Sequence, residues 1–219
     1  MSSASSAWQH QAMTDLWAAV AAERGALADD LAGLTDEQWG TRSLCQNWTV
    51  AQTLAHMTGT GSLTPLSFFG SFARAGFNFN KFANAQIDKH LGSDNAATLA
   101  NFRTIEHSTS APPGPKESWL GEAIVHAEDI RRPLGIKHVY DAGAVVQVAD
   151  FYKGSNTLIG TKSRIAGLAL RATDADWSHG EGEEVSGPML PLLMAMTGRK
   201  AGCAELTGPG VALLEKRSY

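Results

Sequence analysis

The stretch KESWLGEAIVHAEDIRR, residues 116–132, carries the clearest helical pattern of the chain. Side chains that recur every three or four residues lie on one face of an α-helix. That face is apolar here except for one glutamate and one histidine, so it should point into a helical core, with Glu128 and Arg131 pointing well away from it. The residues of this face are Trp119, Ala123, His126 and Ile130, with Glu122 at the edge.

Helical patterns also fill the chain before this stretch. Thr35, followed three residues later by a glutamine, has the pattern of a capping box, and Thr49 is a good N-cap for the helix after it. The segment APPGP at 111–115 reads as a loop, and Pro133 and Gly135 should stop the helix that runs from 116 to 132. The other predicted helices cover about 14–34, 50–61, 66–90 and 96–107. Four main helices and some short ones, all before residue 136, favour a helix bundle over residues 1–140.

The pattern changes in the last third of the chain. Residues 168–173 alternate in the manner of a strand, and a second strand is expected at 184–186, after a turn-rich segment. Further helices are predicted at about 142–159 and 189–197. We therefore predict a mainly α chain in which residues 141–219 form a small α/β unit.

Composition and charge exclude several classes of protein. The net charge is −4 with no broad basic excess, which argues against a nucleic-acid partner. No apolar run reaches the roughly 18 residues of a membrane helix, and residues 1–7 lack the features of a signal peptide.

The only two cysteines, Cys45 and Cys203, form no CxxC pair. They are expected to be small packed residues in a reducing, cytoplasmic compartment. The sequence also lacks a GxSxG elbow, a P-loop and a Rossmann fingerprint.

Glu122 and His126 are the first candidates for chemistry. Their spacing of four residues lets both side chains converge on one point of the same helical face. Burying such a pair costs several kcal/mol unless the two groups are paired or bind a metal. Two interpretations follow from these residues alone: a Glu–His hydrogen bond that holds the core together, or a site for a divalent cation such as zinc.

His56 is the candidate for a third ligand. It lies mid-helix in line with Thr49, Thr53 and Thr60, a row of small polar side chains that suits the wall of a pocket. A single histidine there is commonly a satisfied core residue. Together with the preceding pair it completes a His₂Glu set, and three protein ligands leave a position open, as in catalytic zinc sites. A second cluster, Asp174, Asp176 and His179, is better explained by local hydrogen bonding in a turn.

Several motifs resemble one known family. NWTV at 47–50 with LAH at 54–56 resembles the second-helix motif of the DinB-like superfamily. GEAIVHAEDIRRPLG at 121–135 resembles the signature of its mycothiol-dependent maleylpyruvate isomerase branch. VSG at 185–187 and TGR at 197–199 resemble the end of that branch's C-terminal domain.

The resemblance implies a DinB-like four-helix bundle with zinc, or another divalent metal, on His56, Glu122 and His126. It implies mycothiol as the thiol cofactor and a role for Arg199 in assisting catalysis. The leading hypothesis is therefore a mycothiol-dependent S-transferase or maleylpyruvate-type cis–trans isomerase. Its partners would be a small thiol and a small electrophilic substrate, and the protein would be a monomer or a homodimer.

Two other hypotheses stay open at this stage. The same metal could activate water in a hydrolase, with Asp129, one turn from His126, as the candidate general base. The bundle could also be a non-catalytic protein that binds a metal or a thiol.

Overall fold

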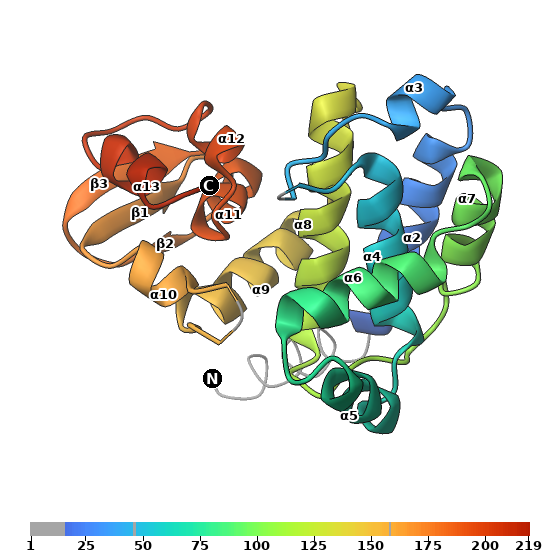
Figure 1. Cartoon of the computed structure of the whole chain (residues 1–219). Coiled ribbons are helices and arrows are strands. Elements are labelled where there is room, and N and C mark those ends of the chain that lie inside the picture. The colour runs from blue at the N-terminus through green and yellow to red at the C-terminus, as the bar shows by residue number, and fades with distance from the viewer. Residues whose placement is uncertain (1–15, 46, 158) are drawn as a thin grey trace, which may run out of the picture. The chain divides into compact units, whose positions relative to one another are not determined.

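The computed structural model describes residues 16–45, 47–157 and 159–219. The chain divides into two compact units, one ending at Lys137 and the other spanning His138–Tyr219. Figure 1 colours the first unit from blue to yellow and the second from orange to red. Within the described ranges, no helix has both the length and the apolarity needed to cross a bilayer.

The first unit consists of helices. α4 packs against α6, α7 and α8, and α2 packs against α7 and α8. Leu54, Phe102 and Ile130 meet in the core between these helices and are fully buried. The helices are α2 (Leu16–Leu31), α3 (Asp36–Trp39), α4 (Val50–Ser62), α5 (Pro65–Arg74), α6 (Phe79–His90), α7 (Asn95–Arg103) and α8 (Glu117–Leu134).

Capping boxes fix where three of these helices, α3, α4 and α5, begin. The Thr35 hydroxyl accepts from the backbone N–H of Gln38, and the Gln38 side chain accepts from the backbone of Thr35. Thr49 and Gln52 repeat the arrangement at the start of α4, with distances of 3.3 and 2.9 Å. Because two otherwise unsatisfied N–H groups gain partners, the first turn of each helix is fixed by local sequence. The capping prediction at Thr35 and the N-cap prediction at Thr49 are confirmed.

Two predictions about helix ends in this unit are wrong. The expected single helix over 66–90 is broken between α5 and α6, where Gly76 and Phe77 have φ values of 65° and 57°. Both lie in the left-handed region, which ends a right-handed helix. The expected end at Arg132 is too early, because Pro133 lies inside the last turn of α8; Gly135, the other residue expected to stop the helix, closes it with φ of 68°. A proline there removes only one backbone donor, so the turn survives.

The two charged residues of α8 expected to point outward are also buried. Glu128 is 5% exposed and Arg131 is fully buried. Each is matched by an opposite charge: Arg132 Nε lies 2.8 Å from Glu128, and Arg131 Nε lies 2.7 Å from Asp30. The helix is therefore covered on more sides than its apolar face indicates, and ion pairs satisfy the charges that this covering buries.

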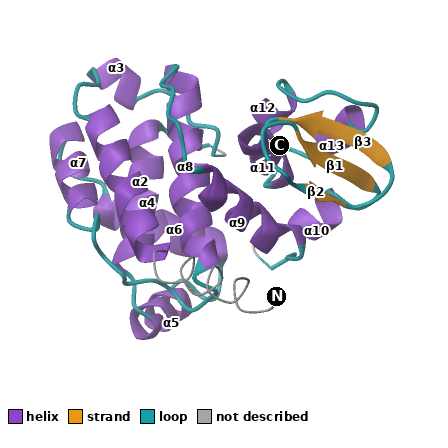
Figure 2. Ribbon diagram, turned by 180° about the vertical axis from the view of Figure 1, so that it is seen from behind, coloured by secondary structure: helices purple, strands orange, loops and turns teal. Residues whose placement is uncertain are grey.

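The second unit contains a three-stranded sheet in the order β2-β1-β3. β1 pairs in parallel with β3, with Leu170 opposite Val185, and antiparallel with β2. Figure 2 shows the three strands in orange beside the helices of this unit. The strands are β1 (Leu168–Ala172), β2 (Ser178–His179) and β3 (Glu183–Gly187), and the helices are α9 (Ala142–Lys153), α10 (Thr161–Arg164), α11 (Met189–Met196), α12 (Lys200–Cys203) and α13 (Val211–Lys216).

The prediction of a mainly helical chain with a small α/β unit at its C-terminal end is confirmed. The alternation at 168–173 forms β1, in which Leu168 and Leu170 are buried. Two details differ from expectation. The helix predicted over 142–159 ends at Lys153, and the turn-rich segment holds the short strand β2. This strand has only two residues, too few to show an alternating pattern in the sequence.

Candidate metal centre

His56 and His126 face one another across the packed helices α4 and α8. Their ring centroids are 5.1 Å apart and the rings are nearly perpendicular, at 83°. The Trp48 ring also lies against the His56 ring, and the centroids of these two rings are 4.7 Å apart. The capping box at Thr49 sets the start of α4 and so determines where His56 falls along the helix. Two imidazoles from different helices are therefore close together.

Glu122 lies one helical turn before His126 on α8. Both of its carboxylate oxygens are buried, and neither has a hydrogen-bond partner among the described residues. Burial raises the pKa of Glu122, while the nearby charges of Arg24 and His126 and the neighbouring hydroxyl of Thr60 act in the opposite direction. The Glu–His hydrogen bond considered from the sequence is not formed. A buried carboxylate without a partner is costly, and a bound cation would supply what is missing.

Arg24 on α2 is a charged neighbour that sequence reasoning missed. It is only 2% exposed, and its Nη1 donates to the carbonyls of Ile105 at 2.8 Å and Ser108 at 2.9 Å. Gly61 leaves room for it, because a Cβ at that position would lie 3.1 Å from Arg24 Nη2. The guanidinium therefore places a fixed positive charge near Glu122. Its helical position among apolar residues gave no sign of this role.

Asp129 orients His126. Its Oδ2 lies 2.8 Å from Nδ1 of His126, and Asp129 is completely buried. Burial lowers the pKa of His126, but the hydrogen bond with Asp129 and the neighbouring Cys45 outweigh it and raise the pKa to about 10. A carboxylate on one ring nitrogen is the usual support for a histidine that binds a metal through the other. Asp129, the candidate general base of the hydrolase hypothesis, is therefore hydrogen-bonded to His126.

Cys45 is the second functional candidate that the sequence did not reveal. One ligand atom each from Cys45, His126 and Asp129 lie within 4.8 Å of one another. Among the described residues this is the one group of three potential ligands so closely spaced, and His56 and Glu122 are not members of it. Cys45 is partly buried rather than packed in a core. No local motif could have found it, because its partners lie far along the chain on α8.

Arg199 lies in the second unit, between α11 and α12. It is 4% exposed, its Nη1 donates to the carbonyl of Thr197 at 3.0 Å, and its guanidinium lies 5.7 Å from the centre of the Tyr219 ring. In the same unit, Asp174 accepts from the backbone N–H of Met189 at 2.7 Å. Met189 opens α11, fifteen residues further along the chain, so this bond ties the turn to α11 and is not the local turn bond expected for Asp174.

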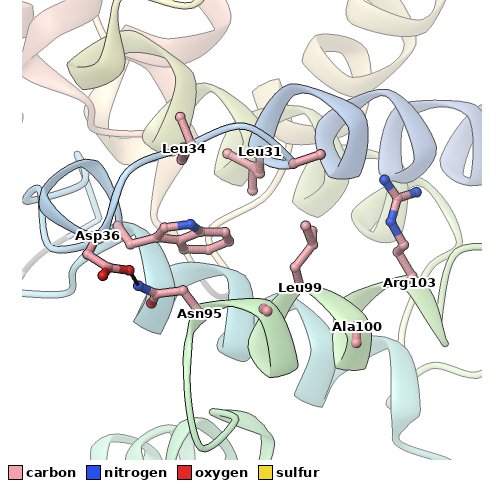
Figure 3. A pocket seen from close by; sticks show the side chains of 10 residues that line it. Leu31, Leu34, Asp36, Asn95, Leu99, Ala100 and Arg103 are labelled. Carbon is pink, nitrogen blue, oxygen red and sulfur yellow. Dashed lines mark hydrogen bonds between the residues drawn. The ribbon is translucent and has the colours of Figure 1, made fainter.

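A separate pocket lies between the end of α2, α3 and α7. Its volume is about 360 Å³, and none of the candidate metal ligands lines it. Figure 3 shows Asp36 and Asn95 joined across its rim, where the Asn95 amide donates to the carboxylate at 2.8 Å. The remaining wall is mostly aliphatic and carries no cluster of titratable groups, so this pocket offers no chemistry comparable with that around His126.

Comparison with known proteins agrees with this architecture. Residues 20–119 match the model of the mycothiol maleylpyruvate isomerase N-terminal domain. No curated protein matches the sequence. Two solved structures share the fold. One is a mycothiol-dependent maleylpyruvate isomerase with a histidine-to-alanine mutation (TM-score 0.62, 13% identity). The other is a mycothiol-dependent maleylpyruvate isomerase without that mutation (TM-score 0.59, 14% identity). Each likeness covers 90% of this chain and 92% of the other. The chain thus has the fold of these isomerases, and its residues 20–119 are similar to the mycothiol maleylpyruvate isomerase N-terminal domain.

Proposed function

We propose that this chain is a metal-dependent enzyme that activates a small thiol, mycothiol, for attack on a small electrophile. The metal, zinc by preference, would be held by His56, Glu122 and His126. The observation that carries the proposal is the buried Glu122 carboxylate, which makes no hydrogen bond among the described residues and lies one turn before His126, whose ring faces that of His56. The fold shared with mycothiol-dependent maleylpyruvate isomerases suggests the identity of the thiol.

The donor set fits the proposed ion. Two imidazole nitrogens and a carboxylate oxygen are ordinary zinc ligands, and three of them leave a position open for an exogenous group. His126 offers Nε2, because its Nδ1 is held by Asp129 at 2.8 Å. The bound cation would give the Glu122 carboxylate a partner in place of the hydrogen bond that it does not make among the described residues. The charge of Arg24 would then face a carboxylate already neutralised in part.

The chain's own residues would prepare the site rather than perform the bond-breaking step. Zinc, when bound, lowers the pKa of a coordinated thiol and makes it a nucleophile at neutral pH. Asp129 fixes the tautomer and orientation of His126. Trp48 lies against the His56 ring, with the ring centroids 4.7 Å apart. No protein nucleophile is required for this chemistry.

Arg199 is proposed as the group that binds an anionic substrate. A planar guanidinium pairs with a carboxylate through two parallel hydrogen bonds and keeps its charge at any physiological pH. The support for this role is the resemblance of TGR at 197–199 to the isomerase branch. Attack followed by return of the thiol would give cis–trans isomerisation, and retention of the adduct would give S-transfer.

The test begins with metal content. Purified protein should contain about one divalent ion per chain, and His56→Ala, Glu122→Gln and His126→Ala should each lose most of it. His107→Ala serves as the matched control, because the His107 side chain is 83% exposed and pairs with Glu106. Full metal occupancy in all three variants would reject the proposed ligands.

Activity is then tested with loaded protein. A panel of carboxylated electrophiles should be converted only when mycothiol is present. Conversion without any thiol would favour a hydrolase, and a full metal site without turnover of the panel would favour a binding protein.

A further inference from the structure

The loop between α3 and α4 is tied to both helices that carry the histidines. The backbone N–H of Leu44 donates to the carbonyl of Asp129 on α8 at 2.9 Å. The Ser43 hydroxyl lies 2.8 Å from the Thr53 hydroxyl on α4. Ser43 also accepts from the backbone N–H of Cys45 at 3.1 Å. Cys45 is therefore held beside α8 by bonds on its own backbone and on the residue before it.

Pro133 explains why the Asp129 carbonyl is available to this loop. In a regular α-helix the carbonyl of residue 129 accepts from the N–H of residue 133. Proline has no N–H, so that acceptor would be left without a partner within α8. The backbone N–H of Leu44 donates to this carbonyl instead. The backbone position that sets the loop, and with it Cys45, is thus determined by the proline within α8.

The spacing of the side chains suits a cation. Cys45, His126 and Asp129 each place a ligand atom within 4.8 Å of the others. Sulfur and nitrogen ligands of one tetrahedral zinc ion lie about 3.6 Å apart, given the usual bond lengths. The observed group can therefore close around an ion with side-chain movements of about an ångström. Its chemistry differs from that of the proposed centre because it includes a thiol.

We propose that Cys45, His126 and Asp129 form a second, sulfur-containing donor set for a thiophilic divalent cation, and that this set shares His126 with the centre made by His56, Glu122 and His126. Thiolate ligands favour soft and borderline metals such as Zn²⁺ and Cd²⁺. On binding, the Cys45 thiol and the protonated His126 each give up one proton to solvent, so the cation binds a thiolate and a neutral imidazole. No oxidant or reductant takes part.

The shared histidine makes the two sets mutually exclusive. A cation held by Cys45, His126 and Asp129 removes His126 from the proposed catalytic set and takes away the carboxylate that orients its ring. Such binding would inhibit the proposed reaction. The inhibition part of the inference rests on the proposed function, whereas the second donor set rests only on the geometry around Cys45.

The experiment is a Co²⁺ titration of the reduced, metal-free full chain in a thiol-free buffer. Coordination by a thiolate gives a sulfur-to-cobalt charge-transfer band in the near ultraviolet, which nitrogen and oxygen ligands do not produce. The band should appear in the unmodified protein and in Glu122→Gln. It should be lost in Cys45→Ser and in His126→Ala. Cys203→Ser is the matched control, because Cys203 is the other cysteine and lies in the second unit.

The results separate the two proposals. Absence of the band in both the unmodified protein and Glu122→Gln, or its survival in Cys45→Ser, would overturn the second donor set whatever the activity. Loss of the band in Glu122→Gln would also overturn it, because sulfur would then bind as part of the Glu122 centre. The proposed function fails separately, if Glu122→Gln and His56→Ala leave the metal content of the purified protein unchanged. Circular dichroism of each variant checks that the variant is folded, so that loss of the band can be attributed to loss of a ligand.

Discussion

Leu44 donates its backbone N–H to the carbonyl of Asp129 at 2.9 Å, and this carbonyl is the one that Pro133 cannot serve within α8. A single backbone bond thus joins the loop before α4 to the helix that carries Glu122 and His126. It places Cys45 beside His126 although no sequence motif connects them. Asp129 contributes twice, since its side chain also holds the imidazole of His126 at 2.8 Å.

Pro133→Ala should weaken this connection. The new N–H at position 133 competes with Leu44 for the Asp129 carbonyl, while the helix gains a regular bond. Hydrogen exchange at the Leu44 amide should therefore become faster, with amides in the middle of α4 unchanged as an internal reference. Equal protection of Leu44 in both proteins would mean that the carbonyl accepts both bonds and that the proline does not control the loop.

Asp129→Asn should weaken metal binding without removing a proposed ligand of the His56 centre. An amide orients His126 less strongly than a carboxylate and adds no negative charge to the imidazole. The loss of a supporting carboxylate typically lowers metal affinity by roughly 10- to 100-fold, which a chelator competition assay measures. Asp176→Asn, an exposed turn residue, is the control. An affinity within twofold of the unmodified protein would show that Asp129 does not support the metal site.

Glu122→Met should have opposite effects on metal binding and on the stability of the metal-free protein. The substitution removes a buried carboxylate that has no hydrogen-bond partner among the described residues. Relief of that cost should raise the free energy of unfolding of chelator-treated protein by about 1–3 kcal/mol. Urea unfolding measures the change, with Glu37→Met, an exposed helical position, as control. A less stable metal-free variant would indicate that Glu122 has a structural partner instead.

Thr49→Ala should destabilise the protein by removing half of the capping box of α4. The Thr49 hydroxyl accepts from the backbone N–H of Gln52 at 3.3 Å, and this acceptor is lost. Such substitutions cost ~1 kcal/mol in the free energy of unfolding. Thr49→Ser keeps the hydroxyl and should recover most of the stability in the same urea experiment. If serine were as damaging as alanine, the methyl group rather than the cap would be responsible.

The contribution of Asp150 to the stability of the second unit should depend on pH. Burial of Asp150 raises the pKa of its carboxyl, but hydrogen bonds from Lys153 and Trp177 dominate and hold that pKa below the ordinary value of 3.8. A carboxyl with a lowered folded-state pKa stabilises the fold above its unfolded pKa, and this contribution is lost as the pH falls through the folded pKa.

Asp150→Asn should therefore lower the free energy of unfolding at neutral pH, and the difference from the unmodified protein should shrink as the pH falls below 3.8. Urea unfolding at a series of pH values measures this. Asp176→Asn should show no comparable trend. A difference that stays constant with pH would mean that the carboxylate charge of Asp150 contributes nothing.

The sequence alone determined the elements whose signals are local. The apolar face at 116–132 predicted α8, the threonines at 35 and 49 predicted two helix starts, and the alternation at 168–173 predicted β1. Such patterns depend on residues at most four apart, so they can be read along the chain. The same periodicity placed Glu122 and His126 on one face of α8.

Only the tertiary structure decided which groups meet at that face. Arg24 approaches Glu122 from α2, and Cys45 approaches His126 from a loop, through contacts between residues far apart in the chain. The hydrogen bond of His126 goes to Asp129 rather than to Glu122, which leaves the Glu122 carboxylate without a partner among the described residues. Periodicity fixes which side of a helix a residue occupies, whereas the packing of neighbouring helices and loops decides which atoms lie within bonding distance.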